Sequence, residues 1–222
     1  MQIAIDGPAA SGKSTLGKAI SGELQFPFLD TGQMYRAVTR KALKGGVAPH
    51  DAVRLTQIAN SMSFRLGPRG LEVDGTPAGP DLHFPDVDSA VSEVSAHAGV
   101  RAVLVRRQRE LADDDSIVMA GRDIGTTVLP DAAVKLWVTA SDEERARRRL
   151  QDQPAETQRE GNSTAVARLR SRDRYDSTRA HSPLQRAPDA ILIDTDGRTL
   201  GQVLDHALAV IQAASGDGPS YD

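Results

Sequence analysis

Short apolar runs alternate with longer amphipathic stretches along this chain. The runs lie at residues 3–5, 27–30, 116–123, 133–140 and 190–194, and each has the length of a single strand. Between them, apolar residues recur every three or four positions, which is typical of helices. Strands that alternate with helices predict an α/β fold, in which helices cover both faces of a parallel sheet.

One stretch interrupts this alternation. Residues 62–79 (MSFRLGPRGLEVDGTPAG) hold two short alternating segments around Gly-Pro-Arg-Gly, which predicts a β-hairpin. We therefore expect a small inserted subdomain, running to about residue 97, within a single domain of 222 residues. Near the end, apolar residues at helical spacing between 200 and 211 predict a helix on the core, and residues 215–222 (SGDGPSYD) predict a frayed tail.

The first junction between a strand and a helix carries a glycine-bounded loop. Residues 7–14 (GPAASGKS) fit the pattern G-x-x-x-x-G-K-[ST] without a mismatch. Glycine lets the chain curl so that backbone N–H groups point into one concavity, and the next helix adds its positive N-terminal end. The alternative is an ordinary glycine turn, which requires neither the lysine nor the serine.

The loop therefore predicts a binding site for a nucleoside triphosphate. Lys13 would reach the β- and γ-phosphates, and the Ser14 hydroxyl would be a ligand of Mg²⁺. The motif says nothing about what receives the phosphate. The residues expected to bind ATP are Gly7, Pro8, Ala9, Ala10, Ser11, Gly12, Lys13, Ser14 and Thr15.

Composition narrows the class of protein. The hydrophobic content of 39% and the charged content of 26% are those of a soluble globular protein. No apolar run approaches the ~18 residues that a membrane span needs. The chain has no cysteine, which excludes disulfides and thiolate metal sites, and its five histidines are too scattered to indicate zinc. No basic leader precedes the first strand, so we expect a cytoplasmic protein.

The charges are distributed unevenly. A net charge of −3 argues against a general nucleic-acid binder, yet 11 of the 22 arginines fall between residues 145 and 186. These arginines could form a solvated helical surface paired with nearby carboxylates. They could equally form a mobile cationic flap over phosphates, because planar guanidinium groups bind phosphate in a bidentate manner. The pattern leaves both interpretations open.

Several classes of phosphate-loop protein have a typical motif or length that this sequence lacks. GTPases read guanine with an Asn-Lys-x-Asp element, but neither Asn60 nor Asn162 is followed by lysine. Motor-like ATPases are usually longer. A small-molecule kinase fits the length of this chain best.

Five stretches carry a resemblance to one family. They are residues 3–15 (IAIDGPAASGKST), 28–39 (FLDTGQMYRAVT), 91–109 (VSEVSAHAGVRAVLVRRQR), 118–132 (VMAGRDIGTTVLPDA) and 172–184 (RDRYDSTRAHSPL). Over nearly its whole length the sequence resembles the bacterial cytidylate (CMP) kinases, in which DTGxMYR and GRDIGTxVxPDA are distinctive. The resemblance implies the nucleoside monophosphate kinase fold, with a five-stranded parallel sheet, a monophosphate-binding insertion at about 62–97 and an arginine-rich lid at about 145–179.

The same resemblance implies a reaction. ATP would transfer its γ-phosphoryl group to CMP or dCMP, giving ADP and CDP or dCDP. The attacking oxygen belongs to a phosphate with a second pKa of about 6, so it is ionised at neutral pH and needs no general base. Catalysis would come from positioning and from cations, namely Mg²⁺, Lys13, Arg122 and Arg179.

The resemblance also assigns residues to the site that binds the acceptor nucleotide. Thr31, Arg36, Arg122 and Arg179 match the residues that hold the acceptor's phosphate. A helix N-cap is the alternative role for Thr31 and a surface ion pair is the alternative for Arg36.

Cytosine presents an amino donor beside two acceptors, which a carboxylate and an arginine would satisfy. The matching positions are Asp123 and Arg101, with Ser92. Asp123 could instead be a carboxylate near Mg²⁺.

Arg172 and Asp176 match the pair that contacts the sugar of the acceptor. The alternative is that they form an ion pair between positions i and i+4 of a helix.

Three features remain less defined. We expect at least one arginine among Arg145–Arg149 to lie in the lid and to reach ATP, and the sequence does not single out one of them. The stretches 77–79 (PAG) and 83–85 (HFP) depart from the family pattern of the insertion. Residues 173–175 (DRY) match an element of thymidylate kinases, but there the element follows a buried strand, whereas here it follows a basic helical pattern.

Two other functions would explain parts of the sequence. A shikimate-type metabolite kinase would share the phosphate loop but would lack DTGQMYR and GRDIGT. A nucleic-acid binder that used the arginine-rich helix would not need the loop. We expect a monomer, because no apolar surface stripe is left over, and its partners to be CMP, dCMP and ATP, with neither nucleic acid nor a membrane.

Overall fold

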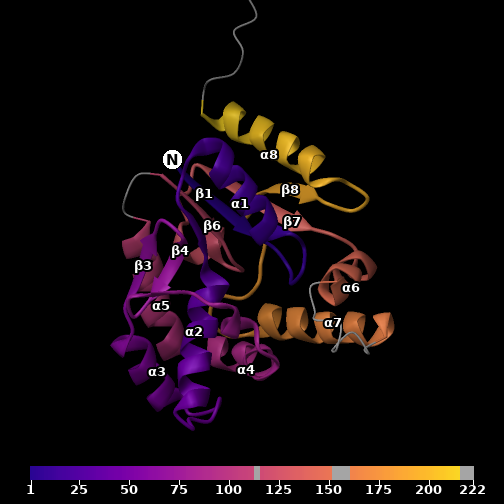
Figure 1. Ribbon diagram of the computed structural model, residues 1–222. Coiled ribbons are helices and arrows are strands. Elements are labelled where there is room, and N and C mark those ends of the chain that lie inside the picture. Colours follow the sequence, from indigo (N-terminus) through magenta and orange to yellow (C-terminus); the bar gives the residue numbers. More distant parts are fainter. Residues whose placement is uncertain (113–115, 152–160, 216–222) are drawn as a thin grey trace, which may run out of the picture.

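Figure 1 shows the computed structural model, which describes residues 1–112, 116–151 and 161–215. A five-stranded sheet with the order β2-β6-β1-β7-β8 forms its centre, and every neighbouring pair of strands in it is parallel. Its strands are β1 (Gln2–Asp6), β2 (Phe28–Asp30), β6 (Ile117–Ala120), β7 (Val134–Thr139) and β8 (Ile191–Asp194). Each of the five apolar runs supplies one of these strands, which confirms the predicted α/β fold.

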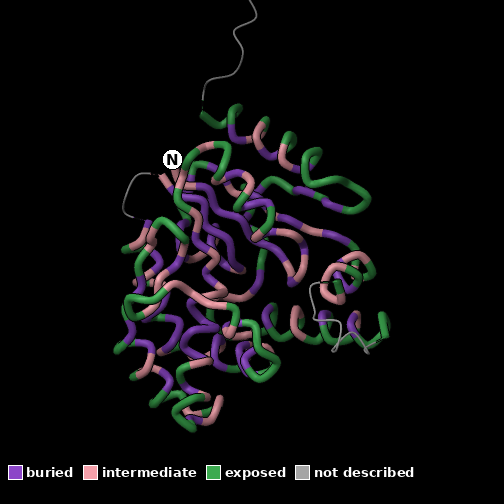
Figure 2. The backbone as a smooth tube through the Cα atoms, viewed as in Figure 1, coloured by how far each residue is buried: buried purple, intermediate pink, exposed green. Residues whose placement is uncertain are grey.

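Helices cover both faces of this sheet because successive side chains of a strand point to opposite sides. Ile3 and Ile5 of β1 pack with α1 (Lys13–Leu24) and α8 (Leu200–Ala214). Ala4 belongs to a second core on the other face. That core is formed with α2 (Thr31–Lys44), α3 (Ala52–Ser61), α4 (Pro85–Ala96) and α5 (Ala98–Leu111). The central strands β1 and β6 are accordingly buried almost throughout, whereas only Ile193 is buried in the edge strand β8 (Figure 2).

The predicted insertion begins with a small antiparallel sheet. β3 (Phe64–Gly67) pairs with β4 (Gly70–Val73), and Gly67 lies opposite Gly70 across a two-residue turn, so the predicted hairpin is confirmed. A short strand, β5 (Thr76–Pro77), pairs with β4, and the 3-10 turn η1 (Pro80–His83) leads into α4. The stretches that depart from the family pattern lie at the junctions of these elements: residues 77–79 lead from the end of β5 to η1, and residues 83–85 lead from the end of η1 into α4.

Two helices on the other side of the phosphate loop correspond to the predicted lid. α6 (Asp142–Gln151) and α7 (Asn162–Thr178) pack against one another, and Ala146, Ala165 and Leu169 form a small apolar cluster with Ala9 of the loop. Residues 152–160 of the predicted lid lie outside the described residues, as do residues 216–222 of the predicted tail. Within the described ranges, no helix has the length and apolar character that crossing a membrane would require.

Candidate active site

A cavity of about 220 Å³ opens where β1, β2 and β6 reach their carboxyl ends. Ligands of open α/β sheets commonly bind at this edge. Lysine and arginine side chains outnumber carboxylates on its wall by seven to three. The basic residues are Lys13, Arg36, Arg101, Arg122, Arg149, Arg172 and Arg179, and the acidic residues are Asp30, Asp123 and Asp176.

The phosphate loop forms one side of this cavity. Gly7 has φ +147°, and a Cβ atom there would lie 2.0 Å from the carbonyl oxygen of Val138, so no other residue fits this turn. Lys13 is buried, and its Nζ donates to the carbonyl oxygen of Pro8 at 2.5 Å and to Ser11 Oγ at 3.3 Å. Burial, together with the nearby positive charge of Arg122, lowers the pKa of Lys13 well below its usual value. Phosphate groups in the loop would therefore stabilise the charged ammonium.

Asp30 connects the phosphate loop to α2. Its Oδ2 accepts a hydrogen bond from Ser14 Oγ at 2.6 Å, and its Oδ1 accepts from the backbone N–H of Gly32 at 3.0 Å. Asp30 is thus the N-cap of α2, and the cap role considered for Thr31 is wrong. The Thr31 hydroxyl instead donates to the carbonyl oxygen of Ala120 at 3.0 Å.

Ser14 and Asp30 also fit the chemistry of a magnesium site. Mg²⁺ prefers oxygen ligands and is usually held by one or two carboxylates together with substrate phosphates and water. A hydroxyl and a carboxylate lie side by side here at the cavity wall. The described part of the chain holds no group of three or more His, Cys, Asp or Glu side chains that could bind a metal by themselves.

Three arginines expected at the acceptor's phosphate meet at the cavity. Arg36 is buried and forms an ion pair with Asp88, so the alternative of a surface ion pair is wrong. Arg122 donates from Nη1 to the carbonyl oxygen of Gly7 at 3.1 Å and from Nε to Asp176 at 3.0 Å. Arg179 lies 3.8 Å from the same carboxylate of Asp176. The structure therefore brings these arginines and Thr31 together, although they come from distant parts of the sequence.

The pair expected to read the base also lies at the cavity. Asp123 is buried, and its Oδ2 accepts from Arg101 Nη2 at 2.5 Å while Arg179 approaches its Oδ1 at 3.5 Å. Arg101 is positioned over the ring of Tyr35 at 5.3 Å. Ser92 is not among the residues that line this cavity and lies on a separate groove between α4 and α7. Ser95 lines the cavity instead, and its carbonyl oxygen accepts from Arg101 at 3.3 Å.

Arg172 and Asp176, one turn apart in α7, both line the cavity. In the described residues no ion pair joins them, because Asp176 pairs with Arg122 and Arg179. The helical ion pair considered from spacing is therefore not formed. Arg172 has a buried Nε without a hydrogen-bond partner, and burial lowers the pKa of its guanidinium to about 10. A buried donor without a partner is costly, and a bound ligand would relieve this cost.

Asp6 was not among the residues that the sequence assigned to the site. It ends β1 and accepts hydrogen bonds from the backbone N–H groups of Ile124 and Gly125, both at 2.8 Å. These contacts hold the loop that carries Arg122 and Asp123. Burial raises the pKa of Asp6 to about 6. The only signal in the sequence is that the first apolar run stops at an aspartate.

Asp173 joins α7 to the phosphate loop. It accepts from the backbone N–H of Ala9 at 2.9 Å and forms an ion pair with Arg145, which in turn donates to the carbonyl oxygen of Ala9 at 3.0 Å. Residues 173–175 therefore lie within a helix, as their basic context predicts, and not after a strand.

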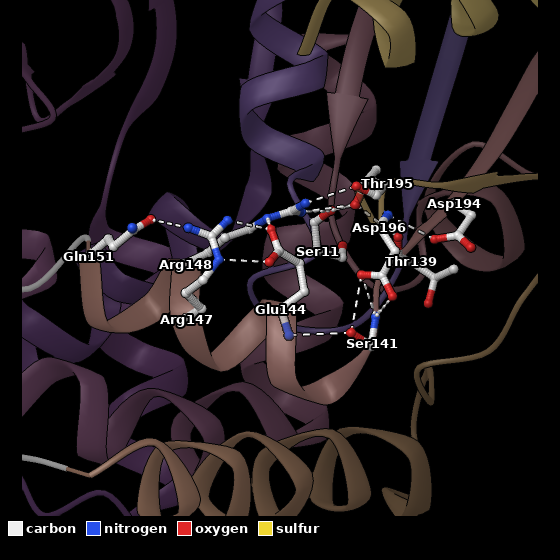
Figure 3. A network of polar contacts seen from close by, with 10 residues as sticks. All are labelled: Ser11, Thr139, Ser141, Glu144, Arg147, Arg148, Gln151, Asp194, Thr195 and Asp196. Carbon is white, nitrogen blue, oxygen red and sulfur yellow. Dashed lines mark hydrogen bonds and ion pairs between the residues drawn. The ribbon is translucent and has the colours of Figure 1, made fainter. Parts of the chain in front are cut away.

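Arg148 approaches the same loop from α6 (Figure 3). It donates to the carbonyl oxygen of Ser11 at 3.3 Å and to Thr195, at 2.9 Å to Oγ1 and 3.0 Å to the carbonyl oxygen. Both Arg147 and Arg148 pair with Glu144, but Arg147 is exposed and its other contact is Gln151 of the same helix. The cluster of arginines thus combines buried contacts to the loop with solvated ion pairs.

The parallel sheet, the phosphate loop after its first strand and the basic cavity together define a phosphate-loop kinase. A shikimate kinase from Bacteroides thetaiotaomicron shares this fold, with a TM-score of 0.51 and 14% sequence identity over 96% of this chain and 98% of that one. The profile of the cytidylate kinase family matches residues 3–213.

Relatives over the full length agree with that profile. A cytidylate kinase from Limosilactobacillus reuteri is 42% identical over 221 residues, covering 96% of this chain and 95% of the relative. Another, from Desulforamulus reducens, is 42% identical over 213 residues, covering 95% and 96%. The chain belongs to the cytidylate kinase family.

Proposed function

We propose that this protein is an ATP-dependent kinase of pyrimidine nucleotide metabolism that phosphorylates CMP or dCMP, giving CDP or dCDP and ADP. One observation carries the proposal: Arg36, Arg122 and Arg179 line the same cavity as the phosphate loop. The loop suits the phosphates of the donor, and the arginines suit a second phosphate that faces them. Transfer of a phosphoryl group between two nucleotides needs both sites side by side.

The chemistry follows from the charges at the cavity. The acceptor's phosphate is ionised at neutral pH, so no side chain has to remove a proton. Lys13, Arg122 and Arg179 would stabilise the charge that is spread over the transferring group. Arg122 is suited to act between the two nucleotides, because it contacts Gly7 of the phosphate loop and Asp176 on the acceptor side.

ATP would lie along the phosphate loop and α6. Backbone N–H groups of residues 7–15 and the N-terminus of α1 would bind its phosphates, and Ser14 with Asp30 would hold Mg²⁺, which neutralises phosphate charge when it is bound. Arg148 is the lid arginine that we assign to ATP, because it already contacts the loop at Ser11. Beside it, a groove of about 770 Å³ bounded by α6 and residues 196–197 has room for the base.

The nucleoside of the acceptor would lie deeper in the cavity. Asp123 would accept from the amino group of cytosine and Arg101 would donate to its ring acceptors. Ser95 lies on the cavity wall and is better placed for this site than Ser92. Asp176 and Arg172 would contact the hydroxyl groups of the sugar.

A coupled assay of ADP release tests this function. The acceptors are CMP, dCMP, UMP, AMP, TMP and shikimate, each with ATP and Mg²⁺. We expect turnover with CMP and dCMP at least tenfold above the other acceptors. Turnover with shikimate alone would indicate a metabolite kinase, and no acceptor-dependent release would indicate a binding protein.

We also propose that the protein is a cytoplasmic monomer that acts on free nucleotides. Large exposed apolar side chains lie on several elements of the described chain, such as Val53 on α3, Tyr175 on α7 and Leu200 on α8, and two of them, Ile191 and Leu192, are adjacent on the edge strand β8. Light scattering should give a mass near 23.7 kDa, and a mass of twice that value would overturn the monomer.

A further inference from the structure

An ion-pair bridge connects three separate elements around the cavity. Asp88, in the first turn of α4, accepts from Arg36 of α2 with Oδ1 and from Arg149 of α6 with Oδ2. The Asp88 side chain is only 13% exposed. Burial alone would raise its pKa, but the guanidinium groups of Arg36 and Arg149 outweigh this and lower it. Asp88 is therefore ionised at neutral pH and joins the predicted insertion to the predicted lid.

Asp88 lies behind the two arginines as seen from the cavity. Arg36 and Arg149 line the cavity, whereas Asp88 lines the separate groove of about 580 Å³ between α4 and α7. Arg149, Leu169 and Arg172 border both spaces and so form the wall between them. A ligand in the cavity would meet the guanidinium groups without displacing the carboxylate.

The contacts of Arg36 show how this arrangement leaves donors available. Its Nη1 donates both to Asp88 and to the carbonyl oxygen of Leu82, the latter at 3.1 Å. Within the described residues, neither its Nε nor its Nη2 has a hydrogen bond to the protein. Asp88 and Leu82 thus hold the Nη1 atom of the guanidinium, and its Nε and Nη2 donors remain for an anion in the cavity.

We propose that Asp88 is a positioning residue that fixes Arg36 and Arg149 for the acceptor's phosphate, and that Arg149 is a further phosphate-binding residue. The identity of the acceptor rests on the proposed function. A guanidinium that is fixed before the ligand arrives loses less conformational freedom on binding. The carboxylate also offsets repulsion among Arg36, Arg149 and Arg172, which lie close enough to affect its ionisation.

The first test is the kinetics of Asp88→Asn, compared with wild type. Asparagine keeps the shape of the side chain, but it removes the charge. It also replaces one carboxylate oxygen with an NH₂ group, which is a donor and would face a guanidinium. We expect kcat/KM for CMP to fall about tenfold or more, mainly through KM, while KM for ATP stays within twofold. Asp88→Glu keeps the charge and should recover part of the loss. The matched control is Glu93→Gln, an exposed residue of the same helix and the same groove, which should change neither constant.

Two measurements separate positioning from support of the fold. The affinity for cytidine, which lacks the phosphate, should be the same in wild type and Asp88→Asn. In the double variant with Arg149→Met, the combined loss should be smaller than the sum of the two single losses, because part of the effect of Asp88 is exerted through Arg149. Equal losses for cytidine and CMP, fully additive losses, or an unchanged KM for CMP would each overturn the proposal.

Binding of inorganic phosphate keeps this test independent of the proposed function. Calorimetry on the nucleotide-free protein should show weaker phosphate binding in Asp88→Asn than in wild type and Glu93→Gln. If wild type fails to phosphorylate CMP but shows this difference, the proposed function falls and the positioning role stands. Equal phosphate affinity, or no phosphate binding by wild type, would contradict the positioning role.

Discussion

At the scale of single residues, Lys13 is the cation of the phosphate loop, where the transferring phosphoryl group is expected to lie. Its ammonium is buried in the loop, and burial together with the charge of Arg122 lowers its pKa, so its charge does not stabilise the empty protein and Lys13→Ala should leave the fold intact. Removing one positioned charge typically lowers kcat by roughly 10²–10³-fold, and we expect a loss of at least that size. Lys18→Ala, an exposed position of the same helix, is the control. A far-UV spectrum like wild type with turnover within tenfold of it would refute the role of Lys13.

Asp123 makes the selection of the base testable. Asp123→Asn keeps the shape but replaces a pure acceptor with a group that can also donate to the oxygen of uracil. A charge-assisted hydrogen bond contributes ~1.5–3 kcal/mol, so the ratio of kcat/KM for CMP over UMP should fall by about tenfold or more. Asp131→Asn, exposed in the same segment, should keep the ratio. Equal losses for both substrates would assign Asp123 to the fold or to the metal.

The raised pKa of Asp6 predicts that the stability of the fold depends on pH. Its pKa is about 6 in the native protein and 3.8 in the reference state, so the native state binds more protons between these values. The contribution of Asp6 to the free energy of unfolding is therefore fully present below about pH 4 and is lost as pH rises through 6. With about 1.4 kcal/mol per pKa unit, the loss is about 3 kcal/mol.

Urea unfolding of wild type and Asp6→Asn between pH 4 and 7 measures this effect. Asparagine does not titrate, so the difference between wild type and variant should shrink with rising pH by about 3 kcal/mol. A difference that is independent of pH would show that Asp6 has an ordinary pKa.

At the scale of elements, α6 and α7 are expected to move as a lid. They are attached to the phosphate loop by polar contacts of Asp173, Arg145 and Arg148 and by a small cluster of apolar side chains, not by a large core. Exclusion of water during transfer would prevent hydrolysis of ATP. Hydrogen exchange in α6 and α7 should slow when analogues of ATP and CMP are added together, and α3 should show no change. Exchange that is unaffected in α6 and α7 would exclude a closing lid.

The elements themselves could be predicted because their signals are local. The phosphate loop and the hairpin at Pro68 and Arg69 follow from residues adjacent in the sequence, and the structure confirms both elements. The cap of α2 shows the limit: Asp30 and Thr31 are both good N-cap residues, and only the backbone decides that Asp30 caps.

At the scale of the whole molecule, the partners of the site residues could not be predicted. Arg122 and Asp176 are 54 residues apart, and Arg149 and Asp88 are 61 apart, so no spacing rule connects them. Spacing favoured Arg172 as the partner of Asp176, but the fold brings Arg122 and Arg179 to that carboxylate. The resemblance to a family indicated which residues meet, whereas their pairing depends on how the lid, the insertion and the sheet are arranged.

The central claim is that one cavity binds a cytosine nucleotide by its phosphate and its base. Steady-state kcat/KM of the wild-type protein for CMP, UMP and cytidine, with ATP and Mg²⁺, tests it most directly. We predict that CMP exceeds UMP by at least tenfold and that cytidine, which lacks the phosphate, gives no ADP release above that of ATP alone. ADP release that CMP does not increase, or that cytidine increases as much as CMP, would contradict the account.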